Sequence, residues 1–186
     1  MTESPQTTET WPTTFGAVCT VVGGLMLFGG CLSYGGMSDL AQLHTAIPFG
    51  EGELSDAAGV LDLLEQYNSN SKTCWVAGFS FGAWVAMQLL MRRPEINRFV
   101  AISPQPNVYD FTFLSPCPAS GIMIYGKKDE LVPVEHLNEL NKRLSSQKGI
   151  KVEFQSVKDA NHFFKKSTAD LSEALDKYIK KESALF

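Results

Sequence analysis

A short glycine-rich motif has the clearest capacity for chemistry in this sequence: residues 78–82 read G-x-S-x-G and centre on Ser80. An apolar stretch at 73–78 precedes it and a helical pattern over 81–93 follows it, so we expect a strand, a tight turn and a helix. Small residues two before and two after the serine let backbone segments approach closely, which presents the hydroxyl as a nucleophile. The amide of Phe81, at the start of the helix, is the predicted oxyanion donor. The alternative is a turn whose serine only caps the helix.

A serine hydroxyl is a weak nucleophile unless a base takes its proton, and the chain offers three histidines for that role. His162 follows an expected strand at 151–157, and the loops after the carboxyl ends of parallel strands converge on one site. His44 lies in an irregular stretch before the motif, and His136 lies on a helix expected over 134–145. We therefore predict that His162 is the base for Ser80.

The base needs an acid that orients its ring, and Asp129 is the predicted partner. It comes directly after an expected strand at 121–126, one strand–helix unit before the loop of His162. Glu130 and Asp159 remain as rivals, and a turn residue in a charged loop is the alternative reading of Asp129.

Two other kinds of site are not supported by the sequence. Residues 121–128 read G-x-x-x-x-G-K-K, which is one residue short of a phosphate-binding loop. The residues between the two glycines are typical of a strand, and Lys128 stands where a magnesium-binding Ser or Thr belongs. We therefore expect no nucleotide site. Because the sequence has neither an H-E-x-x-H motif nor a cluster of histidines and carboxylates, we also expect no metal and no cofactor.

The composition is that of one ordinary folded domain. The chain has 186 residues, of which 44% are hydrophobic and 19% charged, and its net charge is −4. A disordered chain is excluded by the low charge and the many aromatic residues, and the absence of a Lys/Arg cluster makes nucleic acid an unexpected partner. The four cysteines show no C-x-x-C pair, so they are interpreted as small buried side chains in a reducing, cytoplasmic compartment. These cysteines are Cys19, Cys31, Cys74 and Cys117.

Three segments can be distinguished along the chain: a polar tail at 1–14, a glycine-rich apolar segment at 15–50, and an α/β core at 51–186. The second segment contains an uncharged run, 15–32, for which three interpretations stay open. It could form buried strands, a membrane or export segment, or a disordered segment.

Alternating strand and helix patterns fill the core. Strands are expected at 73–78, 98–103, 121–126 and 151–157, and helices at 54–67 (with Ser55 as N-cap), 81–93, 134–145 and 167–180. This alternation predicts right-handed βαβ units and a mostly parallel sheet that is covered on both faces.

Several stretches together carry a resemblance to a known family. They are WVAGFSFGAW at 75–84, MRRPEI at 91–96, NVYDF at 107–111, PCP at 116–118, the loop of Asp129, and ANHFF at 160–164. From about residue 52 to 186 the chain resembles the small, lid-less bacterial α/β-hydrolases of the dienelactone-hydrolase-like family, whereas the first 50 residues do not match. The resemblance implies an α/β-hydrolase fold, a three-layer α/β/α sandwich, with Ser80, Asp129 and His162 as a catalytic triad. Their order along the chain is also the order typical of α/β-hydrolases.

The resemblance weakens upstream of the core. The family carries a His-Pro loop that supplies a second oxyanion amide, and residues 1–50 have no such dipeptide. The glycine pairs at 23–24 and 29–30 are the candidates for that loop, and neither is assigned. Because only 79 residues precede Ser80, we expect a sheet that is shortened at its N-terminal side.

The resulting hypothesis is a serine hydrolase of the carboxylesterase type that cleaves small ester or related acyl substrates through an acyl-enzyme. Only 17 residues separate Ser103 from Gly121, which leaves no room for a large lid. Two alternatives stay open: a truncated, non-catalytic relative, and a hydrolase tethered to a membrane by residues 15–32. The oligomeric state is open. The predicted apolar lining of the substrate pocket consists of Phe79, Phe81, Pro104, Pro106, Phe111 and Phe113.

Overall fold

The computed structural model describes residues 18–22, 50–68 and 70–184. Within them, five strands form one sheet in the order β1-β2-β3-β4-β5, and all neighbouring strands are parallel. The expected parallel sheet is therefore confirmed, and the ends of the four core strands differ from the expected ones by at most two residues. The strands are β1 (Val18–Val22), β2 (Trp75–Phe79), β3 (Arg98–Ile102), β4 (Ser120–Gly126) and β5 (Val152–Val157).

Strand β1 lies within the apolar segment whose structure the sequence left open. It pairs with β2 in register from Val18 opposite Trp75 to Val22 opposite Phe79. A strand is therefore the correct interpretation for these five residues, and β2 has a neighbour on each side. The polar tail, His44, Cys31 and the glycine pairs lie outside the described residues. No helix in the described part of the chain is long and apolar enough to cross a membrane.

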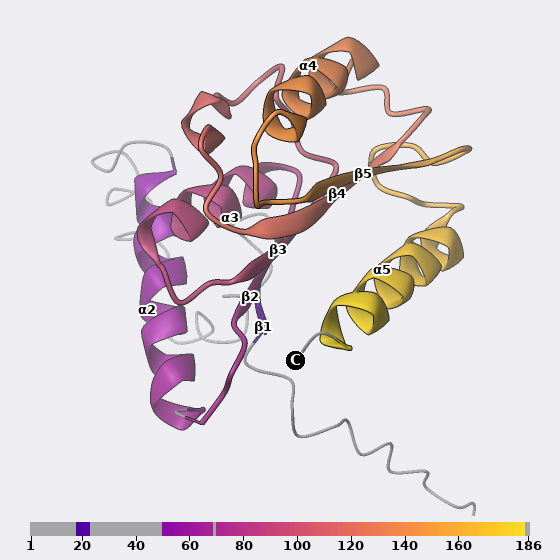
Figure 1. Ribbon diagram of the computed structural model, residues 1–186. Coiled ribbons are helices and arrows are strands. Elements are labelled where there is room, and N and C mark those ends of the chain that lie inside the picture. The colour runs from indigo at the N-terminus through magenta and orange to yellow at the C-terminus, as the bar shows by residue number, and fades with distance from the viewer. Residues whose placement is uncertain (1–17, 23–49, 69, 185–186) are drawn as a thin grey trace, which may run out of the picture.

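Helices cover both faces of the sheet, as Figure 1 shows, which confirms the three-layer arrangement. Helices α2 (Glu51–Tyr67), α3 (Phe81–Arg92) and α4 (Val134–Ser145) pack on one face, and α5 (Thr168–Ser183) packs on the other. The alternation of side chains along a strand supplies both cores: Phe99 of β3 belongs to the first core, and Val100 belongs to the second. A short 3-10 helix, η1 (Thr112–Leu114), lies between β3 and β4.

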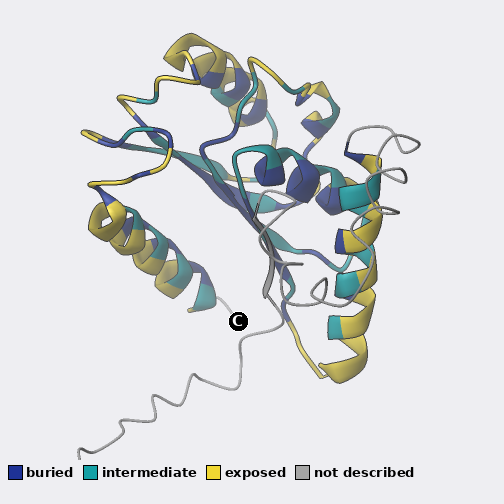
Figure 2. Ribbon diagram, turned by 180° about the vertical axis from the view of Figure 1, so that it is seen from behind, coloured by how far each residue is buried: buried dark blue, intermediate teal, exposed yellow. Residues whose placement is uncertain are grey.

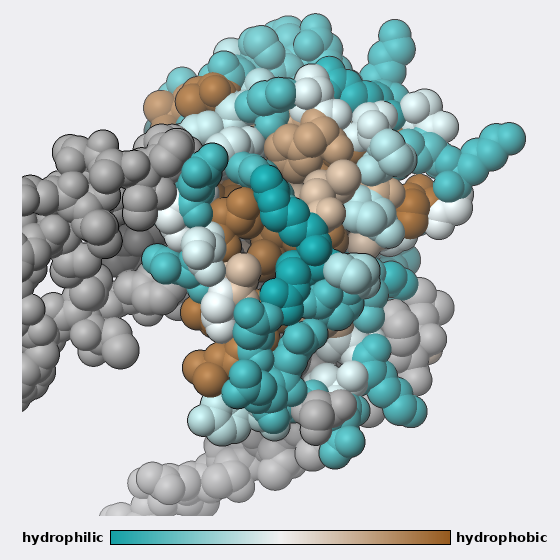
Figure 3. All heavy atoms as spheres, turned by 90° about the vertical axis from the view of Figure 1, so that its left-hand side faces the viewer, coloured by the Kyte–Doolittle hydropathy of each residue, from teal (hydrophilic) through white to brown (hydrophobic). Residues whose placement is uncertain are grey.

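The helices differ in how deeply they are buried (Figure 2). Helix α3 has seven buried residues out of twelve, because it lies between the sheet and α2. Helix α4 buries only Leu137, Leu140 and Leu144, whose spacing places them on one face of a helix. Helix α2 buries only Ala57 and Leu61, and the molecule viewed from the side of α2 presents mostly hydrophilic groups with a few hydrophobic ones among them (Figure 3).

The start of α2 differs from the sequence-based expectation. The helix begins at Glu51, and Ser55 is therefore not its N-cap. Instead, the amide of Gly50 donates to a carboxylate oxygen of Glu53 at 3.1 Å. Gly50 has a φ of 91°, and a Cβ there would lie 2.4 Å from the ring of Trp84. The glycine therefore allows both the left-handed turn and the close contact between α2 and α3.

Candidate active site

Ser80 occupies the tight turn that the G-x-S-x-G motif predicts. Its φ and ψ are 54° and −119°, a strained conformation for a residue other than glycine, and its amide donates to the carbonyl of Ile102 at 2.8 Å. A Cβ on Gly78 would lie 2.1 Å from the carbonyl oxygen of Gly82, so the turn requires glycine at position 78. Ser80 makes no side-chain hydrogen bond that caps α3. The alternative of a simple capping serine is therefore wrong.

His162 lies on the turn after β5, and its imidazole contacts both predicted partners. Nε2 lies 2.9 Å from Oγ of Ser80, and Nδ1 lies 2.8 Å from Oδ2 of Asp129. The side chains of His162 and Asp129 are each 1% exposed, so the contact between these two side chains is shielded from water. Gly126 allows this approach, because a Cβ there would lie 2.2 Å from the carbonyl oxygen of Ala160, just before the histidine.

Asp129 is held in place by its own turn. Its Oδ1 accepts hydrogen bonds from the amides of Leu131 at 2.8 Å and Val132 at 3.1 Å, which leaves Oδ2 for His162. A carboxylate only accepts hydrogen bonds, so Nδ1 carries the proton and Nε2 presents a lone pair to the serine hydroxyl. This is the tautomer that a general base requires.

The rival side chains are placed elsewhere. Asp159 forms an exposed ion pair with Lys128 at 2.7 Å. Glu130 is also exposed, and it contacts the main chain of His162 rather than the ring, at 3.5 Å. His136 lies exposed on α4. Of the candidate bases and acids whose positions are described, only His162 and Asp129 are brought to Ser80.

Gln105 is a polar residue of this site that the sequence analysis missed. It lies in the turn after β3, and its Oε1 is 3.2 Å from Oγ of Ser80. The serine hydroxyl has one hydrogen, so it can donate either to Gln105 or to Nε2 of His162, but not to both at once. A polar residue directly after the strand beside β2 was the available signal, because loops at the carboxyl ends of neighbouring parallel strands meet.

The residues predicted to line a substrate pocket have different surroundings. The ring of Phe79 lies 5.5 Å from that of His162 and 6.0 Å from that of Phe163, which is 54% exposed. Phe111 is 3% exposed in the core beside α3, and Phe113 stacks on it at 6.3 Å. Pro104 is buried and Pro106 is half-buried. Phe79 is thus beside the histidine, whereas a lining role for the others stays a prediction.

The first residue of α3, Phe81, follows the serine directly. Its amide is therefore at the N-terminus of that helix, where the helix dipole favours negative charge. Its ring packs against those of Trp84 and Tyr109 at 5.9 Å and 5.4 Å. Burial raises the pKa of Tyr109. In the described part of the chain, no group of three or more His, Cys, Asp and Glu residues could hold a metal ion.

A parallel sheet between helical layers, with a strained serine on the turn after one strand, defines an α/β hydrolase fold. Comparison with known proteins agrees: the Dienelactone hydrolase family matches residues 28–184, and the chain belongs to that family. The match begins at residue 28, so it includes part of the segment that the motifs left unmatched.

Two solved structures and one curated protein are among those similar to this chain. A putative alpha/beta hydrolase of unknown function from Agrobacterium tumefaciens is 48% identical, with a TM-score of 0.71 over 73% of this chain and 62% of that one. A serine hydrolase without a lid from Xanthomonas campestris is 27% identical, with a TM-score of 0.63 over 73% of this chain and 59% of that one. An uncharacterized protein of Rickettsia prowazekii is 46% identical over 70% of this chain and 56% of its own length. The chain thus spans about three fifths of the length of these relatives.

Proposed function

We propose that the chain is a serine hydrolase that cleaves small ester or related acyl substrates through a covalent acyl-enzyme. One observation carries the proposal: Ser80, His162 and Asp129, from the loops after β2, β5 and β4, form a chain of contacts of 2.9 Å and 2.8 Å. This is the constellation that activates a serine hydroxyl, and it is recognised by geometry rather than by position in the sequence.

In the first step, Oγ of Ser80 attacks the acyl carbon while Nε2 of His162 takes its proton. The carboxylate of Asp129 stabilises the imidazolium, and the Phe81 amide receives the negative charge on the substrate oxygen. The bond to the leaving group then breaks, and the imidazolium gives its proton to the leaving oxygen. In the second step, His162 takes a proton from water, which attacks the acyl carbon. The bond between the acyl carbon and Oγ then breaks, and the imidazolium returns the proton to Oγ, which releases the acid and regenerates Ser80.

Small, apolar acyl substrates fit the surroundings of the serine. Exposed apolar side chains come from the same loops as the site: Phe163 follows the histidine, Leu131 follows the aspartate, and Val108 follows Gln105. The side-chain amide of Asn107 donates to the carbonyl of Leu131 at 3.0 Å, which ties the loop after β3 to the loop of Asp129. Only 17 residues separate Ser103 from Gly121, too few for a large lid, so we expect short acyl chains to be preferred over long ones.

The test is labelling of the full chain by a fluorophosphonate, followed by intact-mass measurement. We expect one label per chain, loss of labelling in Ser80→Ala, and p-nitrophenyl acetate hydrolysis that falls about 10⁴-fold or more in that variant. Acetate and butyrate esters should be cleaved faster than the palmitate ester. Absence of labelling in the natural protein, or equal labelling of Ser80→Ala, would overturn the proposal.

A further inference from the structure

The end of β3 and the turn after it are hydrogen-bonded to Ser80, to the strand that leads to Asp129 and to His162. The carbonyl of Ile102 accepts from the amide of Ser80 at 2.8 Å. The amide of Ser103 donates to the carbonyl of Ile124, on the strand that leads to Asp129, at 2.8 Å. The hydroxyl of Ser103 donates to the carbonyl of His162 at 2.9 Å. One short turn therefore links parts of the chain that are far apart in sequence.

Ser103 is an unusual residue in this position. It is fully buried, and its φ of 46° lies in the left-handed region, which glycine adopts at less cost than serine. A glycine would satisfy the backbone and remove the strain, but it would lack the hydroxyl. What serine adds at this position is thus the hydrogen bond to His162.

The main chain on either side of His162 is held by other hydrogen bonds, whereas the carbonyl of His162 itself accepts from Ser103. The amide of Lys128 donates to the carbonyl of Ala160 at 2.9 Å, and the amide of Phe164 donates to the carbonyl of Asn161 at 3.1 Å. The amide of His162 meets Glu130 only at 3.5 Å, a long contact. Among the described residues, the hydroxyl of Ser103 is the donor to the carbonyl of His162.

We propose that Ser103 is a positioning residue that holds the main chain of His162 where its ring meets both partners. The inference rests on the proposed hydrolase function. The ring must satisfy Asp129 and Ser80 at once, at 2.8 Å and 2.9 Å, so a shift of its main chain lengthens at least one contact. Misplacement by about 1 Å costs up to about 100-fold in rate. Ser103 touches no reacting atom and acts through the histidine.

The test compares Ser103→Ala and Ser103→Gly in the full chain, with Ser120→Ala as the matched control. Ser120 also uses its hydroxyl for a backbone partner, the amide of Lys151 at 3.0 Å, but at the amino end of β4. We expect fluorophosphonate labelling to be about 10- to 100-fold slower in both Ser103 variants and unchanged in the control. Ser103→Gly should be slow although it relieves the left-handed strain, which separates positioning from stability.

The second measurement needs no activity. Long-range ¹H–¹⁵N spectra report which ring nitrogen of His162 carries the proton. We expect the Nδ1–H form in the natural protein and a mixture of tautomers in both Ser103 variants. The inference is overturned if labelling stays within about twofold of the natural protein, or if labelling slows while the ring nitrogens stay unchanged.

If the natural protein is not labelled at all, the hydrolase proposal fails. The tautomer of His162 then decides alone: a changed tautomer supports positioning, and an unchanged one overturns it.

Discussion

The two ends of the sheet are built in different ways. At the carboxyl end, three residues other than glycine have a left-handed φ: Ser80, Ser103 and Phe164. They follow β2, β3 and β5, and no other described residue except glycine has this conformation. Each costs conformational free energy: Ser80 is the candidate nucleophile, Ser103 binds the main chain of His162, and Phe164 lies two residues after that histidine.

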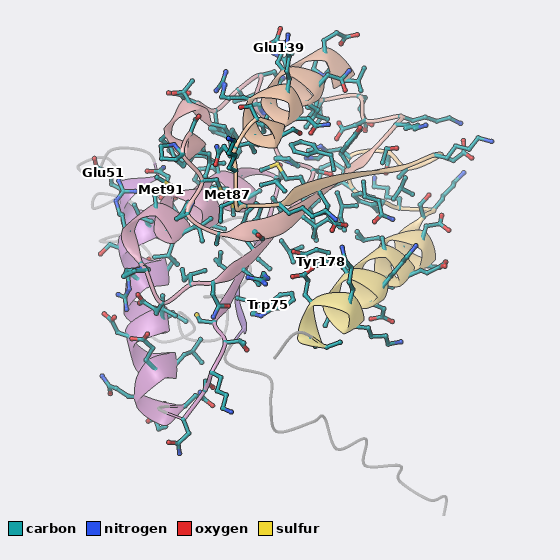
Figure 4. The ribbon with its side chains drawn as sticks, in the orientation of Figure 1. Glu51, Trp75, Met87, Met91, Glu139 and Tyr178 are labelled. Carbon is teal, nitrogen blue, oxygen red and sulfur yellow. The ribbon has the colours of Figure 1, made fainter. Side chains whose placement is uncertain are left out.

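The amino end has ion pairs and aromatic packing in place of strain. Arg98, the first residue of β3, pairs with Glu182 of α5 at 2.8 Å. Trp75, the first residue of β2, meets Tyr178 of α5 edge-on at 6.0 Å, and Figure 4 shows the two rings between the sheet and α5. Burial raises the pKa of Tyr178 well above its usual range, and the nearby Glu182 carboxylate raises it further.

Backbone strain and stabilising contacts therefore lie at opposite ends of the strands. Two of the strained residues at the carboxyl end are serines, Ser80 and Ser103, whose hydroxyls both contact His162, and the third, Phe164, follows that histidine. Contacts at the amino end join α5 to the sheet and contribute stability without touching the site. Substitutions of polar side chains at the carboxyl end should therefore lower mainly the activity, and substitutions at the amino end should lower mainly the free energy of unfolding.

The largest expected effect is on activity. Asp129→Asn keeps the size of the side chain but favours the wrong tautomer of His162, so we expect kcat to fall about 10⁴-fold. The midpoint of urea unfolding should change little. Steady-state hydrolysis of p-nitrophenyl acetate and urea unfolding measure the two quantities. Asp159→Asn, in an exposed ion pair, is the control and should retain full activity. If Asp129→Asn were as active as Asp159→Asn, Asp129 would have no role in catalysis.

The second prediction concerns Gly78, which the strained turn of Ser80 requires. In Gly78→Ala, the new Cβ meets the backbone of Gly82 at 2.1 Å, so we expect a loss of about 3 kcal/mol or more of unfolding free energy together with loss of activity. Gly59→Ala, in helix α2, is the matched control, because a Cβ at that position would have no neighbouring atom within 4 Å. That control should gain about 0.5–1 kcal/mol. A Gly78→Ala variant as stable as the natural protein would contradict the tight turn.

The smallest expected effect tests the other end. Glu182→Gln removes the charge from the pair with Arg98, whose side chains are 9% and 19% exposed. We expect a loss of about 1–2 kcal/mol in unfolding free energy, because a hydrogen bond between charged groups becomes a weaker one. Activity should stay within about twofold of the natural protein. A large loss of activity at unchanged stability would show that the two ends are coupled.

Much of the fold could be predicted from local patterns. Helix α4 has the expected bounds, and the core strands were each located within two residues, because alternating and helical periodicities are properties of short segments. Strand β1 could not be distinguished from a membrane segment or disorder, because its glycine-rich, uncharged surroundings are compatible with all three. The start of α2 was misplaced because Gly50 and Glu53, rather than Ser55, make the contacts at its N-terminus.

By itself, the sequence determined which residues could act: a serine in a G-x-S-x-G turn, and an aspartate and a histidine after later strands. Chemistry and chain order are enough for that inference, because each loop follows a recognisable strand. Only the tertiary structure excluded Glu130 and Asp159 from the acid position and brought Gln105 to the serine. It alone also placed the hydroxyl of Ser103 on the carbonyl of His162, 59 residues away in the chain. Such contacts depend on strand order and register, which are set by pairing across the whole sheet rather than by the short segments that meet.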